Sequence, residues 1–436
     1  MALGGGTFVS QNKELPGVYI NFVSASSASA VLSERGIATM PLELDWGIPG
    51  EVFEVTGEMF QKNCREIFGY DSSHEKMRGL QDLFLNARTL YAYRVNGKGQ
   101  KAENSMAVAE YPGIRGNDLM IAVQVNADDE NMFDVRTMLG VETVDEQTVG
   151  KAEDLMPNSY VRWKSDAVLE AAAGNPLTGG TNGTATGNDY QDYLNKIESY
   201  AYNTMGAAVT DRTTKALFTS FVKRLRDEMG VKFQLVLYDY AEADHMGVIS
   251  VKNKICDQGW GEAGLVYWAT GISAGCAVNK SSQNRKYDGS FQVDTAYTQN
   301  QLKEAIRGGE FILHRAGQEI RVLADINTLV TVSDTQGEIF QENQTVRVID
   351  QIGNDIAVLF NTKYLGAVPN NSAGRVSLWS DIVAYHRQLE QIDAIEDFSD
   401  ADVTAKPGNS KKAVVITTAI TVVNTMDKLY MSVTVS

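Results

Sequence analysis

The chain has 436 residues, of which 43% are apolar, and it carries 39 lysines and arginines against 55 aspartates and glutamates, a formal charge of -16. This length leaves room for two to four domains. The negative charge argues against a surface that neutralises nucleic-acid phosphates. No apolar run approaches the roughly 18 residues of a transmembrane helix, and the first residues lack the basic and apolar regions of a secretory signal.

Residues that usually bind metals or cofactors are few. Cys64, Cys256 and Cys276 are too few for a disulfide framework, which is typical of a protein made in a reducing cytoplasm. The four histidines show no spacing typical of a metal site. No G-x-x-x-x-G-K-[ST] phosphate loop occurs. The sequence therefore predicts no metal and no cofactor.

The chain begins with a segment that we expect to be an extended arm, residues 1–23. Gly4-Gly5-Gly6 makes its start flexible, and Pro16-Gly17 precedes a strand-like run. A leading segment of this kind is usually a disordered tail, but this one has apolar side chains to bury. The residues assigned to its strand are Val18, Tyr19, Ile20 and Phe22.

Residues 24–98 predict a small mixed α+β domain. A helix is expected from Glu58 to Phe68, ended by Gly69. The apolar spacing around Leu80 to Ala87 is helical, and the run from Leu90 to Val95 is typical of a strand.

Residues 99–180 predict an inserted, sandwich-like all-β domain, because short apolar strands alternate with polar turns. Glycine-rich breaks bound it at Asn96–Gly99 and Gly174–Gly183, which indicates an insertion into a larger body. The expected strands are Met106–Ala109, Leu119–Val125, Met132–Val135 and Tyr160–Trp163.

The pattern then changes, and residues 181–335 predict an α/β core domain. A helix is expected from Tyr190 to Tyr200, and a second one, capped by Asp211, carries one apolar stripe. The strand Phe233–Tyr238 follows at once, and this alternation is typical of α/β folds. The apolar stretch Glu262–Asn279 predicts a buried helix.

Residues 336–405 are expected to form a C-terminal domain with a strand at Thr345–Asp350 and a helix at Ser377–Gln391. One face of this helix carries Leu378, Ile382, His386 and Leu389. The polar stretch Ser399–Ser410, broken by proline and glycine, indicates a linker. The predicted fold class is therefore α+β and multidomain: an α/β core with an inserted all-β domain and extended strand arms at both ends.

Residues 406–436 are expected to form the rest of the linker and a strand arm. From Lys412 onward the pattern indicates two strands joined by a short polar segment. In the second strand one face is apolar and the other polar, with Leu429, Met431, Val433 and Val435 opposite Tyr430, Ser432, Thr434 and Ser436. A two-stranded ribbon is marginal alone. Its third strand comes either from its own domain or from another copy by strand addition, and the pattern leaves both open.

One segment suggests catalysis. Gly271-Ile272-Ser273-Ala274-Gly275 matches the G-x-S-x-G nucleophile elbow, and His314 and His386 lie downstream. The elbow needs a strand before it and a helix after it, whereas Ser273 falls late in a predicted helix, and no HGGG-type oxyanion segment occurs upstream. The competing interpretation is that these small residues allow close helix packing. An α/β serine hydrolase using Ser273 is the alternative function.

Other motifs are weaker. Gly259-x-Gly261-x-x-Gly264 lacks a preceding strand and the acid about 20 residues later that a dinucleotide site needs, which favours a glycine loop. His245 beside Asp244 could form half of an acid–base pair, but a solvated loop is the simpler interpretation. A surface-layer or adhesin-like module would need a secretion signal.

Five short segments resemble the tail sheath proteins of contractile phage tails and R-type bacteriocins, in particular those of Gram-positive defective prophages and diffocin-like particles. They follow the family's order along nearly the whole chain. They are Leu15–Tyr19, Tyr111–Asp118, Asp325–Thr331, Val346–Asp350 and Met426–Val433. Each is short and none is catalytic.

The resemblance implies a structural subunit without enzymatic activity. Such subunits would stack as six-membered rings around a tail tube, and their terminal arms would add strands to a neighbouring subunit's sheet. The α/β core would be subtilisin-like by fold only. Partners would be other copies, the tube protein, and baseplate and terminator proteins, with no nucleic acid or membrane. The particle would be a virion tail or a bacteriocin, assembled in the cytoplasm of the bacterial host and contracting to drive the tube through a bacterial envelope.

Overall fold

The computed structural model describes residues 32–435, which fall into two compact units. We call Glu34–Asp350 with residues 424–435 the core unit, and residues 32–33 with Gln351–Val423 the C-terminal unit. The residues predicted to form the first arm's strand, Val18, Tyr19, Ile20 and Phe22, lie outside the described residues, as does Ser436.

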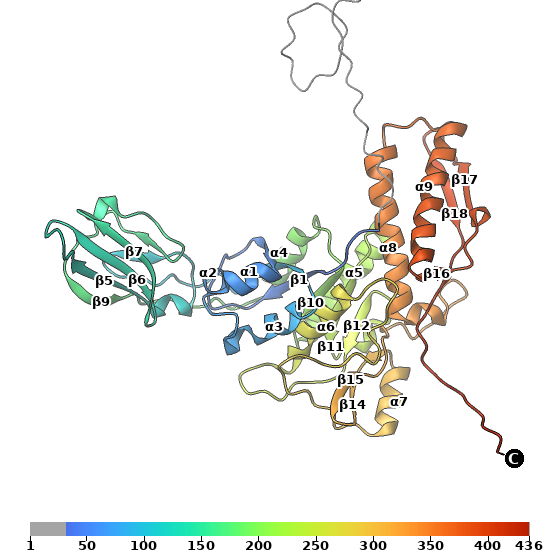
Figure 1. The fold of residues 1–436 in the computed structure, drawn as a ribbon, viewed down its shortest axis with the longest axis horizontal. Helices are drawn as coiled ribbons and strands as arrows, with labels where there is room; N and C mark the ends of the chain where they lie inside the picture. Colours follow the sequence, from blue (N-terminus) through green and yellow to red (C-terminus); the bar gives the residue numbers. More distant parts are fainter. Residues whose placement is uncertain (1–31, 436) are drawn as a thin grey trace, which may run out of the picture. The chain divides into compact units, whose positions relative to one another are not determined.

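The core unit is built on a seven-stranded sheet in the order β13-β12-β11-β10-β1-β3-β2, of which Figure 1 labels β1, β10, β11 and β12. Neighbouring strands are parallel except β2 and β3. The strands are β1 (Ile37–Leu42), β2 (Val52–Thr56), β3 (Thr89–Arg94), β10 (Thr204–Ala207), β11 (Gln234–Tyr238), β12 (Val248–Val251) and β13 (Glu310–Phe311). A small antiparallel hairpin follows, made of β14 (Leu313–Ala316) and β15 (Glu319–Val322).

Each face of this sheet has its own apolar core, because successive side chains of a strand point to opposite faces. Val236 of β11 packs with α3 and α6, whereas Leu235 and Leu237 pack with α4 and α5. The unit's helices are α1 (Gly57–Lys62), α2 (Cys64–Phe68), α3 (Arg78–Phe84), α4 (Gly187–Ile197), α5 (Arg212–Lys223), α6 (Leu265–Gly275) and α7 (Gln299–Arg307). The prediction of helix–strand alternation with a buried helix near Glu262–Asn279 is confirmed.

Asp211 caps α5 as the sequence predicts. Its carboxylate accepts a hydrogen bond from the backbone N–H of Thr214 at 2.7 Å. Beyond Lys223 the helix continues as a π-helical turn, Arg224–Met229, and ends at Gly230 in a left-handed conformation. The cap and the glycine therefore set the two ends of one apolar helix.

An all-β domain is inserted between β3 and α4 (Figure 1, left). Its antiparallel sheet has the order β7-β6-β5-β9, beside a two-stranded pair β4-β8, over a separate apolar core. The strands are β4 (Ala107–Ala109), β5 (Leu119–Val125), β6 (Phe133–Leu139), β7 (Glu142–Val149), β8 (Val161–Trp163) and β9 (Ala172–Pro176).

Two of these strands were not predicted. The strand β7 is mostly polar, and its two valines, Val144 and Val149, lie on opposite faces, so no apolar alternation marks it. The prediction of a break from Gly174 was wrong at its start, because residues to Pro176 form β9 on the edge of β5. Gly174 lies close to the side chain of Met120 on β5, where a Cβ would lie 2.3 Å from the sulfur.

The C-terminal unit contains two long helices and two small antiparallel sheets, β16-β19 and β17-β18. The elements are α8 (Asn343–Leu359), which enters the unit at Gln351, α9 (Ser372–Gln391), β16 (Ile395–Glu396), β17 (Val403–Pro407), β18 (Val414–Thr418) and β19 (Thr421–Val422). The predicted apolar face of α9 is confirmed, since Leu378, Ile382, His386 and Leu389 are all buried.

Two predictions for this region were wrong. Thr345–Asp350 is the start of α8 rather than a strand, because its β-branched run continues into an amphipathic helical pattern. The polar segment Ser399–Ser410 is a short 3-10 turn followed by β17, which pairs with β18. Its first residue caps that turn, so the polar composition reflects capping and exposure rather than a linker.

Two fully buried ion pairs fix the first turns of α8 in the core unit. Arg226 binds Asp350 through two hydrogen bonds, of 2.6 and 2.7 Å. Arg347 donates to Asp325, which also accepts from the backbone N–H of Ser282 at 2.9 Å. Burial alone would raise the pKa of Asp325, but the charge of Arg347 and these hydrogen bonds outweigh it and hold that pKa below its usual value.

The helices α3 and α6 pack closely because α6 carries glycines at the contact. A Cβ at Gly271 would lie 2.3 Å from the carbonyl oxygen of Leu83, and one at Gly275 would lie 2.1 Å from that of Asn86. The small residues of the G-x-S-x-G segment are thus explained by helix packing.

We expect Gly271→Ala to lower the free energy of unfolding. Helix propensity favours alanine by about 1 kcal/mol, but overpacking against a backbone oxygen costs about 1–3 kcal/mol, and the clash should dominate. Gly187→Ala is the matched control, because its Cβ meets no atom within 4 Å in the first turn of α4. Urea unfolding of both variants measures the difference, and equal stabilities would contradict this account of α6.

We expect Asp325→Asn to cost about 3–5 kcal/mol at neutral pH, because it leaves the Arg347 charge buried without a counter-charge. The control Asp400→Asn breaks an exposed pair with Arg387 and should cost under about 1 kcal/mol. Since the folded pKa of Asp325 is lowered, its contribution is complete above the unfolded value of about 4 and is lost as pH falls through the folded pKa. Urea unfolding measured at a series of pH values, from neutral down into the acid range, tests this, and a pH-independent cost would contradict it.

Candidate assembly surfaces

The end of the chain is an extended arm that forms no strand pairing within residues 32–435. Leu429, Met431, Val433 and Val435 keep strict alternation, and their side chains are 72–89% exposed. Single exposed apolar side chains are common on protein surfaces. A periodic row of them with free backbone groups is instead typical of a strand that awaits a sheet.

The root of this arm is held on the core unit by polar contacts. The backbone N–H of Thr425 donates to the side-chain oxygen of Gln344 at 3.1 Å. Thr345 donates to the side chain of Asn424, and Gln283 donates to Asp427. The arm is therefore tied down as far as Asp427 and projects from there.

The C-terminal unit carries two sheets with incomplete edges. β17 pairs with β18 over five residues, and α9 covers β17, with the Trp379 indole N–H donating to the carbonyl of Val403 at 2.8 Å. Neither strand has a second strand neighbour within residues 32–435. Val415 on β18 is half exposed. Such an edge offers unpaired N–H and C=O groups to an added strand.

The segment around Tyr111-Pro112-Gly113 joins the inserted β domain to the core sheet. The buried guanidinium of Arg94 donates to the carbonyls of Gly47 and Pro112 at 3.0 and 2.6 Å, and burial lowers its pKa to about 10. Gly113 adopts a φ of 139°, and a Cβ there would lie 2.0 Å from the Asp45 carbonyl oxygen. These residues therefore act as a joint between the inserted domain and the core sheet.

Ser273 lies in the middle of α6, with helix on both sides. It is buried, and its hydroxyl accepts a hydrogen bond from that of Thr204 at 3.3 Å. A nucleophile elbow presents its serine on a turn from strand to helix. The local geometry of Ser273 therefore does not match the one that the motif requires.

The other candidate chemical residues also have structural roles. The prediction of a solvated loop at His245 was wrong, because this side chain is buried and its ring lies 3.2 Å from Asp227. Burial lowers the pKa of His245 despite that carboxylate. Asp244 instead accepts from the backbone of Val330 and Thr331. The glycine segment from Gly259 forms a loop before a 3-10 turn.

Two kinds of feature are absent from the described part of the chain. Among residues 32–435, no group of three or more His, Cys, Asp or Glu side chains is placed to hold a metal ion. None of the helices within that range combines the length and apolarity needed to cross a membrane.

Models of four sheath domains match the chain in order. The Tail sheath protein Gp18 domain III N-terminal region matches residues 35–95, and the phage tail sheath protein beta-sandwich domain matches 95–182. The central domain of phage tail sheath protein matches 183–328, and the phage tail sheath C-terminal domain matches 335–436.

The chain is also similar to individual proteins along most or all of its length. The phage-like element PBSX protein XkdK of Bacillus subtilis is 30% identical, over all of this chain and all of its own. The crystal structure of a sheath tail protein from Desulfitobacterium hafniense is 36% identical with a TM-score of 0.84, covering 95% of this chain and 99% of that one. The contracted helical sheath of the anti-feeding prophage, at 12% identity, shares the fold with a TM-score of 0.57, covering 97% and 99%.

The fold is thus mixed α/β and multidomain with a β-sandwich domain, and it is that of sheath proteins from contractile particles. The relatives that span the full chain include a sheath tail protein, and the matched domains leave only short segments uncovered. The chain belongs to the family of contractile tail sheath proteins, the structural subunits of phage tails and related contractile particles.

Proposed function

We propose that this chain polymerises as stacked hexameric rings around a tail tube, and that its subunits are linked by donated terminal strands. The observation that carries the proposal is the exposed, alternating row from Leu429 to Val435 at the end of a tethered arm. Contraction of this polymer would drive the tube through a bacterial envelope. The tube, baseplate and terminator proteins would be its partners, and the particle would assemble in the host cytoplasm.

The β17-β18 sheet is the receiver that we propose for a donated strand. Its two strands are joined by a short turn and backed by α9, so the sheet is held before a third strand arrives. Val18, Tyr19, Ile20 and Phe22 are proposed to form the second donated strand, from the other end of a neighbouring copy. Together the two arms would complete both edges.

A donated strand must overcome the entropy of ordering the arm. Burying four apolar side chains contributes about 6–12 kcal/mol. Fixing the seven backbone residues from Leu429 to Val435 costs about 7–14 kcal/mol. These amounts nearly cancel, so the main-chain hydrogen bonds and the multiplicity of links in a lattice would decide the outcome. A subunit would then remain soluble alone and associate as a polymer.

The domain division predicted from the sequence is kept as a proposal: 1–23, 24–98, 99–180, 181–335, 336–405 and 406–436. The matched family ranges support the four inner domains to within several residues, except at the start of the first, where the match begins at 35, and at the end of the fourth, where it runs to 436. Pairing of β17 with β18 spans the last boundary, so the free arm begins after β19. A subtilisin-like fold for the core, without its activity, stays a prediction.

Deleting Leu429–Ser436 should leave a folded, soluble subunit that forms no tubes. The described part of this segment buries little apolar surface, so its deletion should change the free energy of unfolding by less than about 0.5 kcal/mol. Electron microscopy and sedimentation of the purified chain measure assembly.

A matched pair of triple variants tests whether assembly needs the apolar face of the arm or only the presence of an arm of this length. Leu429→Ser, Met431→Ser and Val433→Ser together should block assembly, whereas Tyr430→Ser, Ser432→Ala and Thr434→Ser together should not. Normal tubes from the truncated chain would show that donated strands do not link the subunits.

A further inference from the structure

The C-terminal unit carries opposite charges at the two ends of α9. Near its first turn lie Arg375, Lys406, Lys411 and Lys412, which we call the basic end. Around and beyond its last turn lie Glu390, Asp393, Glu396, Asp397 and Asp400, which we call the acidic end. The chain as a whole is strongly negative, so a concentrated basic end is a departure from its average.

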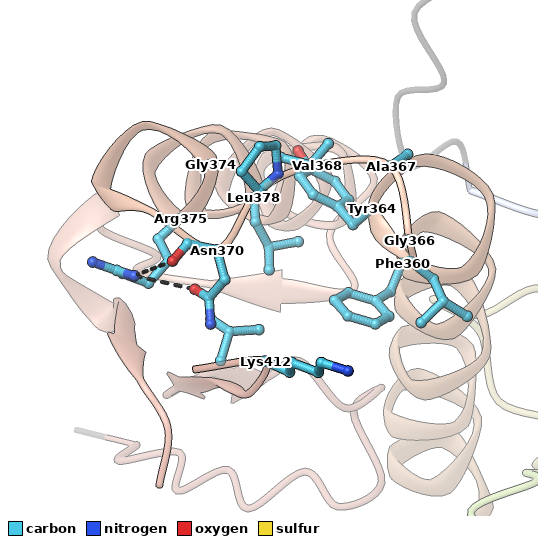
Figure 2. A pocket seen from close by; sticks show the side chains of 13 residues that line it. Phe360, Tyr364, Gly366, Ala367, Val368, Asn370, Gly374, Arg375, Leu378 and Lys412 are labelled. Atoms are coloured by element: carbon cyan, nitrogen blue, oxygen red, sulfur yellow. Dashed lines mark hydrogen bonds between the residues drawn. The ribbon is translucent and has the colours of Figure 1, made fainter. Parts of the chain in front are cut away.

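Local contacts hold the basic end together. The side-chain amide of Asn370 donates to the carbonyls of Lys411 and Ala413 at 3.2 and 2.7 Å. Arg375 donates to the side-chain oxygen of the same asparagine at 3.1 Å (Figure 2). The hairpin turn between β17 and β18 is thereby tied to the start of α9. Within residues 32–435 none of the four cations of the basic end takes part in an ion pair.

The acidic end is equally well defined. Phe398 donates its backbone N–H to Glu390 at 3.0 Å, which folds the following loop onto the last turn of α9. Asp400 is paired with Arg387. Asp393, Glu396 and Asp397 are exposed, and they have no ion-pair partner in the described part of the chain. The end therefore keeps a net negative charge.

This arrangement opposes the helix dipole. A helix is stabilised by acids near its first turn and bases near its last, yet α9 has no acid in its first turn and no base in its last. The two ends also cannot neutralise each other, because Arg375 and Glu390 are about 22 Å apart along the helix, well beyond a Debye length of about 8 Å. A charge pattern that does not stabilise its own helix points to another molecule.

The basic end also carries a concave surface. A pocket of about 550 Å³ opens between the π-helical turn Phe360–Tyr364 that follows α8, the start of α9 and β18 (Figure 2). Its walls are mainly apolar, from Phe360, Tyr364, Leu365, Val368, Leu378 and Val414, and Arg375 and Lys412 also line it. An acidic loop could therefore bind there with both charge and shape complementarity.

We propose that the basic end of one C-terminal unit binds the acidic end of a second copy, head to tail. The occupant is the segment from Asp393 to Asp397, which includes the short strand β16 and carries the exposed acids Asp393, Glu396 and Asp397. Because the two surfaces differ, the contact is heterologous and propagates around a ring or along a helix instead of closing a dimer. It rests on the proposed polymer, and it adds an electrostatic contact that orients subunits before strands are exchanged.

The test compares assembly rates of full-length variants by light scattering. The double variant Lys411→Glu, Lys412→Glu reverses two of the four positive charges of the basic end. The control Lys303→Glu, Arg307→Glu makes the same change in net charge at exposed positions of α7. At low salt the first pair should assemble at least about tenfold more slowly than the control pair. The difference should vanish near 1 M salt, where the Debye length is about 3 Å.

A charge exchange adds a second readout. Glu396→Lys with Asp397→Asn, introduced into the Lys411→Glu, Lys412→Glu chain, should bring the rate back to within about threefold of the parent. Asparagine is used at Asp397 because this residue has a φ of 54°. If the reversed chain assembles like its control, the charge contact is overturned while the arm deletion can still support strand donation. If the parent forms no polymer at all, both proposals fail.

Discussion

Backbone hydrogen bonding is the constraint on which the rest of this structure depends. N–H and C=O groups of an extended apolar segment need partners once water is excluded. The arm from Leu429 to Val435 finds none within residues 32–435, while β17 and β18 each keep an edge without a strand neighbour. The same chain thus presents an unpaired strand and incomplete sheets. An isolated subunit leaves both exposed to water, and the strand donation proposed above would pair them with each other.

Three of the segments that resemble sheath proteins, Tyr111–Asp118, Asp325–Thr331 and Val346–Asp350, contain residues that join elements of the described structure. Asp325, Arg347 and Asp350 supply three of the four charges in the two buried ion pairs. Pro112 and Gly113 fit the inserted β domain against Arg94. Such groups tolerate few replacements because each buried charge or crowded backbone position has one partner geometry. A motif can therefore be specific without taking part in any reaction.

Much of the core and the β domain could be predicted from the sequence because their side chains follow simple periods. The apolar stripe behind Asp211 and the strand ending at Tyr238 are local signals that tertiary contacts reinforce. The errors arose where local signals conflict with context. Thr345–Asp350 has strand-forming residues, but its charges bind buried partners and its pattern continues as a helix. The polar β7 has no apolar period to recognise.

The candidate assembly surfaces were likewise predicted only in part from the sequence. The alternation of Leu429, Met431, Val433 and Val435 is visible in the sequence because a strand has a period of two. The edges of β17 and β18 were not predicted, because the capping residues and Pro407 give this segment the composition of a linker. The charge separation along α9 was missed as well, since the loop after Asn370 and the hairpin turn at Lys411 meet only in three dimensions.

The anchoring of the arm's root has a mechanical consequence. Asn424 and Thr425 are bound by Thr345 and Gln344, and the next turn of the same helix carries Arg347 and Asp350 in their buried pairs. Tension on the last residues would thus pass within two turns into the most firmly held charges of the subunit. A neighbour that pulled on this tether would displace the whole core as a body and would not peel the end away.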